Sequence, residues 1–506
     1  MWWENAVFYE IYIPSFADSD GDGIGDIEGI RSRLSYLKAV GIDAIWLTPF
    51  YPSPKVDNGY DVSDYCAVDP QYGSLEQLMR LIEDAHQLEI KIIIDVVFNH
   101  TSTNHPWFIE AASSKESLKR DWYIWRDSPN NWESFFGGSA WSFDEITKQY
   151  YYHSFAKEQA DLNWQNKEVK QAVLQVIQFW LELGVDGFRF DVINNLTVND
   201  QFSDNPIGED GRQIHRYDVN QSGIMETLKE LNEWIKEQNP EVFTVAEISS
   251  DNLSLINSYT DEAHFDTAFH FNLGSMKHLD LQNLQKLTKE FQEMSKQNKI
   301  PTLFFNSHDM SRSWNRLANN DYSLYQLFAV FVLINRGISF LFQGEEQGAA
   351  DYEAQSFEDI RDIQAKNKYR EMLLSMSEEQ ALLEANQVNR DRSRGMIAWN
   401  NDQDAGWIGI GPRNPEADHI LTLYKQLIQL RKEEGPFQTI NMIKLQEACL
   451  SYQTENLHII LNFGKRKVQH PLQVKMSTLF GRGTLSTDGN LVQVPPKACW
   501  IGKEHL

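Results

Sequence analysis

The chain has 506 residues, enough for a large core and for two or three domains. Its formal net charge of −26 argues against nucleic acid or an anionic membrane as a partner, and its 42% hydrophobic residues argue against wholesale disorder. We find no apolar run of membrane-spanning length, no secretory signal pattern, and no metal or redox spacing among the three cysteines. These features predict a cytoplasmic protein, either a monomer or a small homo-oligomer.

Apolar strands alternate with amphipathic helices along most of the chain. The expected strands span residues 6–12, 42–47, 90–97, 184–191, 243–247, 265–271, 303–309 and 337–343. The expected helices span residues 26–40, 75–88, 168–183, 223–238, 283–297, 322–335 and 417–432. The strand at 90–97 is almost wholly apolar, which is typical of a parallel sheet buried on both faces. Eight strands alternating with helices predict an α/β fold, a (β/α)8 TIM barrel.

Two stretches depart from this alternation and predict additional domains. Residues 101–165 are rich in Trp, Asn, Ser and Gly and are too long for a plain loop, so we expect a small inserted domain. Residues 436–506 change to short apolar runs typical of an antiparallel β domain. The catalytic barrel would then comprise residues 1–100 and 166–435.

Four of the expected strands end in acidic or imidazole side chains. Arg189 and Asp191 are one residue apart, so on a strand they point to the same side, where an isolated charge would be costly. The other three strands lead to Asn99 and His100, to Glu247, and to His308 and Asp309. In a (β/α)8 barrel the C-terminal rim of the strands carries the chemistry, so these residues predict an active site there.

The same segments resemble the signature regions of the α-amylase superfamily of retaining glycoside hydrolases, in its oligo-1,6-glucosidase and α-glucosidase branch. The four matching segments are Asp95–His100, Gly187–Asp191, Ala246–Glu247 and Asn306–Asp309, in the family's order. The resemblance covers almost the whole chain.

This resemblance implies that Asp191 is the nucleophile, Glu247 the acid/base and Asp309 the third carboxylate. In a retaining glycosidase one ionised carboxylate attacks the anomeric carbon while a protonated carboxyl, roughly 5–5.5 Å away, donates a proton to the leaving oxygen. Arg189 should keep Asp191 ionised. The apolar approach to Glu247 should raise the pKa of its carboxyl.

The resemblance also implies a binding pocket for a terminal glucose. His100 and His308 would donate to sugar hydroxyls, and Asp57 and Tyr60 match positions that hold the glucose. Arg394 matches an arginine that pairs with the position of Asp57 and closes the pocket, which would make the enzyme exo-acting on short oligosaccharides.

Val192 follows the nucleophile and matches the residue found where the branch prefers α-1,6 over α-1,4 bonds. Its β-branched side chain is stiff and would narrow the side of the leaving group.

A separate acidic loop predicts a structural Ca²⁺ site. Acids at alternate positions with glycines between them suit a hard cation, although Gly29 stands where an EF-hand loop has its bidentate glutamate. By resemblance to the branch's metal loop, the expected ligands are Asp18, Asp20, Asp22, Asp26 and the carbonyl of Ile24.

Several functions remain open at this point. The leading hypothesis is an exo-acting α-glucosidase that hydrolyses non-reducing-end α-1,6-linked glucose from a small oligosaccharide. Alternatives within the family are trehalose-6-phosphate hydrolysis, α-1,4-glucosidase activity, and glucosyl transfer or isomerisation of sucrose. A phosphate site could come from Arg212, His215 and Arg216. A non-catalytic, amylase-like binding protein is the remote alternative.

Overall fold

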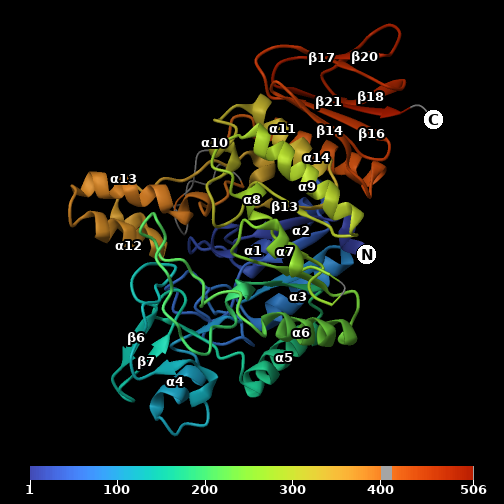
Figure 1. Cartoon of the computed structure of the whole chain (residues 1–506). Helices are drawn as coiled ribbons and strands as arrows, with labels where there is room; N and C mark the ends of the chain where they lie inside the picture. Colours follow the sequence, from blue (N-terminus) through green and yellow to red (C-terminus); the bar gives the residue numbers. More distant parts are fainter. Residues whose placement is uncertain (262, 400–408, 410–412, 505–506) are drawn as a thin grey trace.

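The computed structural model describes residues 1–261, 263–399, 409 and 413–504, and its centre is an eight-stranded parallel barrel (Figure 1). Around the sheet, β1 lies between β2 and β13, and the other strands follow in chain order. The strands are β1 (Val7–Ile11), β2 (Ala44–Leu47), β3 (Lys91–Val96), β9 (Gly187–Phe190), β10 (Phe243–Ala246), β11 (Thr267–Ala268), β12 (Thr302–Leu303) and β13 (Ile338–Phe342). The predicted (β/α)8 barrel is confirmed.

Amphipathic helices surround the barrel. They are α1 (Ile27–Ser32), α2 (Leu34–Val40), α3 (Leu75–Gln87), α5 (Lys167–Glu182), α6 (Ile224–Gln238), α9 (Leu281–Lys296), α11 (Tyr322–Leu333) and α14 (Ala417–Glu434). The helix predicted over 26–40 divides in two, because Arg33 leaves helical geometry with φ −103° and ψ 0°. Strands β11 and β12 are shorter than predicted, since the chain leaves the ladder early and turns along the rim.

The barrel interior is filled by large apolar side chains from many strands. They form one buried cluster that includes Phe8, Trp46, Phe243, Phe269, Phe304 and Phe340. Strand alternation explains the cluster, because Phe8 points inward while Val7 and Tyr9 point to the helices. The interior is therefore a packed core, and the polar site must lie above it at the strand ends.

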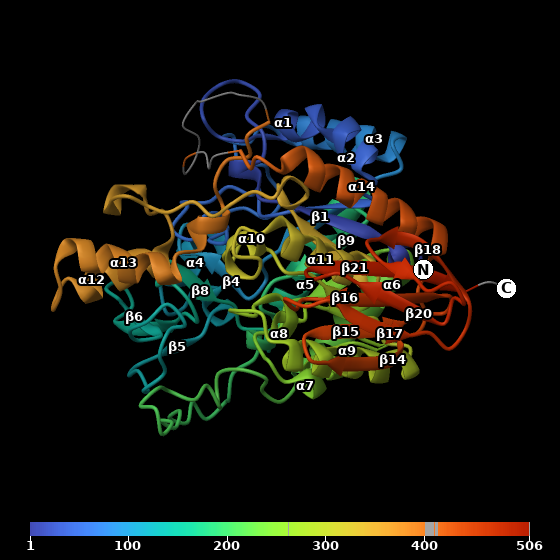
Figure 2. The ribbon, with the colours of Figure 1, turned by 90° about the horizontal axis from the view of Figure 1, so that it is seen from above.

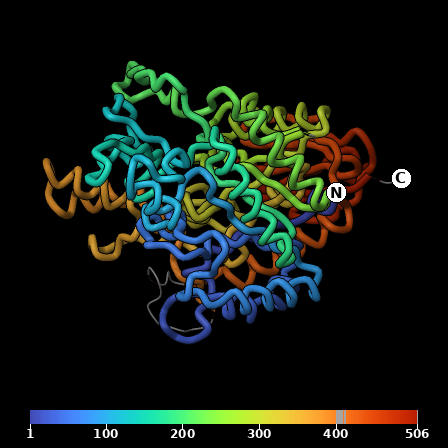
Figure 3. Tube along the Cα trace, turned by 90° about the horizontal axis from the view of Figure 1, so that it is seen from below, coloured from blue at the N-terminus to red at the C-terminus, as the bar shows by residue number. Residues whose placement is uncertain are grey.

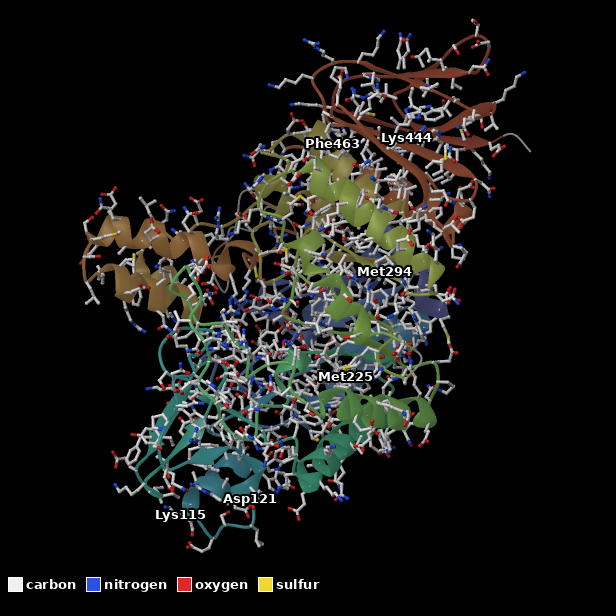
Figure 4. All side chains as sticks on the ribbon, in the orientation of Figure 1. Lys115, Asp121, Met225, Met294, Lys444 and Phe463 are labelled. Carbon is white, nitrogen blue, oxygen red and sulfur yellow. The ribbon has the colours of Figure 1, made fainter. Side chains whose placement is uncertain are left out.

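A small subdomain follows β3. It contains β4 (His100–Ser102) paired with β8 (Gln159–Asp161), α4 (Pro106–Ser113), and a sheet of β5 (Trp125–Arg126), β7 (Gln149–Tyr152) and β6 (Trp141–Asp144). Lys115 and Asp121 mark its outer end in Figure 4. Because β4 pairs with β8, this insertion returns to the barrel beside His100.

A helical hairpin that the sequence did not predict stands next to this subdomain. It consists of α12 (Ile363–Met372) and α13 (Glu378–Val388), and it projects from the barrel close to β6 (Figure 2). The Asn367 side chain donates to the carbonyl of Phe136 at 3.4 Å. Asp362, which caps α12, and Arg390, which follows α13, thereby reach the rim of the barrel.

The C-terminal part is an antiparallel β domain beside α11. One sheet contains β14 (Asn441–Gln446), β15 (Cys449–Gln453), β16 (Leu457–Asn462), β21 (Ala498–Glu504) and β18 (Met476–Gly481). The other contains β17 (Val468–Pro471), β20 (Leu491–Val494) and β19 (Thr484–Leu485). Phe463, labelled in Figure 4, packs on Phe328 of α11 with ring centroids 5.7 Å apart.

The N-terminus lies on the same side of the molecule as the C-terminal β domain (Figure 3). None of the helices in the described ranges is long and apolar enough to cross a membrane.

Candidate active site

The register of three neighbouring strands places the central side chain of the site. Arg189 on β9 lies opposite Asp95 on β3 and Val245 on β10. Its Nη1 donates to Asp95 Oδ1 at 2.8 Å and to Asp191, and its Nη2 donates to Glu247. Arg189 is only 2% exposed. One buried guanidinium therefore brings the predicted nucleophile and the predicted acid/base together.

The pKa of Asp191 differs from the expectation. Burial raises the pKa of Asp191 to about 6, although the charge of Arg189 acts in the opposite direction. Arg189 thus moderates the effect of burial and does not hold the carboxyl far below its ordinary range. Asp191 is still mostly ionised at neutral pH.

Glu247 lies at the end of β10 and stays protonated to a higher pH than Asp191 does. Burial raises the pKa of Glu247 to about 8. The charge of Arg189 acts against this rise, and the charges of Asp191 and Asp309 add to it. The direction agrees with the expectation from the apolar approach of β10. The two carboxyls therefore carry opposite protonation states at neutral pH, with Asp191 ionised and Glu247 protonated.

Asp309 has the opposite environment. Burial alone would raise the pKa of Asp309, but the charges of His308, Arg390 and Arg394 outweigh it and hold the pKa far below the usual range. Arg394 Nη2 donates to Asp309 Oδ1 at 2.8 Å, and Arg390 Nη1 lies 3.5 Å from the same oxygen. Asp309 is therefore an ionised acceptor facing the pocket.

Tyr60 and His308 connect the carboxylates in one wall of the pocket. The Tyr60 hydroxyl donates to Asp95 Oδ2 at 3.0 Å and lies 2.8 Å from His308 Nε2. His308 Nε2 is also 3.1 Å from Asp309 Oδ2.

His100 is located at the start of the inserted subdomain and lies near the pocket. Its Nε2 is 3.1 Å from the Tyr60 carbonyl and 3.0 Å from the Gln159 side-chain nitrogen. Burial lowers the pKa of His100 to about 4, so the ring is neutral at neutral pH.

The arginine that pairs with Asp57 is not the predicted one. Arg390 Nη2 lies 2.8 Å from Asp57 Oδ1 and 2.6 Å from Asp362 Oδ1, whereas Arg394 bonds to Asp309 and donates from Nε to the His308 carbonyl at 2.7 Å. The difference arises because the turn after α13 directs the two arginines to different carboxylates. The partner of Asp57 is therefore Arg390, and closure of the pocket by this pair stays a prediction.

Val192 occupies a strained turn directly after the nucleophile. Its φ of +36° is in the left-handed region, which β-branched residues rarely adopt. Its backbone nitrogen lies 3.4 Å from Glu247 Oε2, and only 8% of the residue is exposed. The backbone of Val192 is thus held against the acid/base residue, and the narrowing of the leaving-group side by its side chain stays a prediction.

Two adjoining cavities extend outward from Glu247. The inner cavity, about 560 Å³, is lined by Glu247, Asp309, Asp251, Phe271, Ser275 and others. The outer cavity, about 600 Å³, shares Asp251 and Ser275 with it and continues to Lys286 and Glu290. Of the described residues that line the two cavities, four are acidic and Lys286 alone is basic. This side of the site is therefore negatively charged.

The three basic residues considered as a phosphate site lie apart from these cavities. Arg212 has an 88% exposed side chain that faces Asp210 at 3.9 Å, and Arg216 is exposed as well. His215 stacks on Phe135 at 4.2 Å between ring centroids, and its Nδ1 lies 2.6 Å from Asp218. The described structure does not bring the three together as a cationic pocket.

The acidic loop after β1 brings together three of the four predicted carboxylate ligands, and the carbonyl of Ile24 stays a prediction. Asp18, Asp20 and Asp22 offer carboxylate oxygens that all lie within 4.8 Å of one another. Asp26 instead accepts from the backbone nitrogens of Gly29 at 2.7 Å and Ser19 at 2.8 Å. Asp26 therefore caps α1 and closes the loop. A group of hard oxygen donors of this kind suits Ca²⁺.

Sequence reasoning missed four residues of the site. They are Glu10, Gln159, Asp362 and Arg390. Glu10 had a detectable signal, because it is an acid near the end of an apolar strand, as Asp191 and Glu247 are. The other three come from the insertion and from the hairpin region, whose positions depend on tertiary packing.

Comparisons with known proteins agree with this geometry. Residues 10–439 match the family model described as "Alpha amylase, catalytic domain". A "Probable oligo-1,6-glucosidase 3" of Bacillus subtilis (strain 168) is 39% identical over 471 residues, covering 86% of this chain and 85% of the relative. An "Oligo-1,6-glucosidase" of Bacillus cereus is 35% identical over 509 residues, covering 91% of each.

A solved structure is similar over almost the whole fold. The crystal structure of Bacillus licheniformis trehalose-6-phosphate hydrolase matches with a TM-score of 0.90 and 33% identity, covering 99% of both chains. With the barrel, the carboxylates at its rim and the family match in agreement, this chain belongs to the α-amylase family of glycoside hydrolases.

Proposed function

We propose that this enzyme is an exo-acting α-glucosidase that releases non-reducing-end, α-1,6-linked glucose from short isomalto-oligosaccharides. The observation that carries the proposal is the group of side chains around Arg189. It combines an ionised Asp191, a protonated Glu247 and an Arg390–Asp57 pair that would close the end of a glucose pocket. Such a pocket suits one terminal glucose, and the oligo-1,6-glucosidases among the relatives support the linkage.

The reaction follows the retaining mechanism that is general in this family. Asp191 attacks the anomeric carbon while Glu247 gives its proton to the leaving glycosidic oxygen, which produces a covalent glucosyl-enzyme. Glu247 then accepts a proton from the water that releases glucose. Asp309, Arg394 and His308 would bind sugar hydroxyls and orient the ring.

Trehalose-6-phosphate hydrolysis is the second candidate, because a structural relative has that activity. The cavities beside Glu247 argue against it. Besides the protonated Glu247, their lining carries the carboxylates of Asp251, Asp309 and Glu290 and one lysine, Lys286, which lies 3.8 Å from Glu290. A phosphorylated leaving group would meet net repulsion there, whereas a neutral sugar would not.

A panel of substrates tests the proposed function. We expect rapid release of glucose from isomaltose and panose, slower release from maltose and sucrose, and very little from trehalose or trehalose-6-phosphate. Released glucose is measured enzymatically, with Asp191→Asn as the inactive control. Cleavage of trehalose-6-phosphate with little action on isomaltose would overturn the proposal.

Val192→Ala should relax the linkage preference. The substitution removes two methyl groups and should widen the site on the side of the leaving group. The kcat/KM for isomaltose divided by the kcat/KM for maltose should therefore fall about tenfold. Val185→Ala is the matched control, because Val185 is also a buried valine but precedes β9 at the opposite end. An unchanged ratio in Val192→Ala would show that this side chain does not set linkage.

The pH dependence of kcat/KM should be bell-shaped. Activity should rise as Asp191 ionises near pH 6 and fall as Glu247 loses its proton near pH 8, with an optimum about pH 7. Initial rates on isomaltose from pH 4 to 10 measure both limbs. A plateau that extends well above pH 8 would contradict the role given to Glu247.

Ca²⁺ should stabilise the fold through Asp18, Asp20 and Asp22. Binding to the native state alone should raise Tm by roughly 2–4 °C over the value in EDTA. The double variant Asp20→Asn/Asp22→Asn should lose this difference and keep its activity. Identical melting curves of the wild-type protein in Ca²⁺ and EDTA would refute the metal site.

A further inference from the structure

Glu10 is a buried acid beneath the glucose pocket. It lies near the end of β1, opposite Trp46 on β2 and Phe342 on β13, and only 2% of it is exposed. Its Oε1 accepts from His308 Nδ1 and from the His308 backbone nitrogen at 3.3 Å. A carboxylate can only accept hydrogen bonds, so this contact fixes a proton on Nδ1 of His308.

The remaining contacts of His308 leave its ring no alternative position. The rings of Tyr60 and Tyr12 both stack on the imidazole, with centroids at 5.5 Å and 6.1 Å and interplanar angles of 10° and 12°. Nε2 points to the Tyr60 hydroxyl and to Asp309. Glu10 therefore holds His308 at Nδ1, and His308 in turn contacts Asp309 through Nε2.

A small cavity connects Glu10 to the catalytic arginine as well. Its volume is about 10 Å³, and its lining includes Glu10, Trp46, Arg189, Asn306 and His308. Two buried donors on these residues have no hydrogen-bond partner among the described residues: Trp46 Nε1 and Arg189 Nε. Unpartnered buried donors beside a carboxylate point to a small polar occupant, and this volume fits one water molecule.

We propose that Glu10 is a positioning residue for the glucose pocket, holding His308 directly and Arg189 through one water in the cavity beneath them. The water would accept from the unpartnered donors and donate to the carboxylate of Glu10. The proposal rests on the proposed function only in assigning the glucose pocket to Arg189, His308 and Asp309, and it does not depend on the linkage cleaved.

Glu10→Gln and Glu10→Leu test the role of this carboxylate. Loss of a hydrogen bond to a charged group predicts a fall in kcat/KM of roughly tenfold for the glutamine and a hundredfold for the leucine variant. The substrate is 4-nitrophenyl α-glucoside. The concentration of active sites is titrated with a fluorinated glucosyl fluoride, and each rate is divided by that concentration. Misfolded protein is thereby excluded from kcat/KM. Isomaltose should show the same fold loss, because the glucose pocket is common to both substrates.

A double-mutant cycle separates positioning from stability. If Glu10 acts through His308, Glu10→Gln should cost much less in a His308→Gln background than alone. The structural control is Asp186→Asn, which weakens the partly buried pair with His86 at the other end of β9. This variant should have a lower Tm and an unchanged kcat/KM per titrated site. Full additivity, or wild-type kcat/KM in Glu10→Leu, would overturn the role of Glu10.

A high-resolution crystal structure tests the water. We expect one ordered water within hydrogen-bond distance of Glu10 and Arg189 Nε in the wild-type protein. A cavity without density, or a water that does not reach Glu10, would overturn this part of the proposal. Absence of isomaltose hydrolysis alongside these kinetic results would instead reject the proposed linkage and leave the role of Glu10 intact.

Discussion

The buried guanidinium of Arg189 is the interaction on which the site depends. Three carboxyl groups, those of Asp95, Asp191 and Glu247, bond to it from three neighbouring strands. Removing one partner from a buried ionic group of this kind leaves uncompensated charge and typically costs 3–5 kcal/mol. Burial raises the pKa of both Asp191 and Glu247 and the charge of Arg189 lowers both, and the balance leaves the pKa of Asp191 at about 6 and that of Glu247 at about 8.

The pocket as a whole carries more acids than bases. The carboxylates are those of Glu10, Asp57, Asp95, Asp191 and Asp309, beside the protonated Glu247, and the guanidinium groups facing them are those of Arg189, Arg390 and Arg394. An excess of negative charge is unfavourable in a free site. It becomes favourable when positive charge develops on the sugar ring in the oxocarbenium-like transition state. The strain at Val192, in the turn after Asp191, is a comparable local cost at a functional position.

Different parts of the fold control different properties of the enzyme. Strand ends supply Asp191 and Glu247, because the barrel holds them rigidly and close together. The insertion and the α12–α13 hairpin supply Gln159, Arg390 and Asp362, which contact Asp57 or one another. The acidic cavities near α7 (Leu253–Ser258) and α9 lie where the proposed function places the leaving group. Selectivity can therefore change in these segments without altering the catalytic carboxyls.

The sequence by itself determined the barrel and the positions of Asp191, Glu247 and Asp309 on it, because strand periodicity is local and parallel strands must end at one rim. It also indicated the acidic loop at Asp18 from spacing alone. Only the tertiary structure decided that Arg390 and not Arg394 faces Asp57, that Asp26 caps a helix, and that Glu10 supports His308. Partner choice among several nearby charges depends on side-chain direction and on packing between segments more than 300 residues apart, as for Asp57 and Arg390. No local pattern encodes that information.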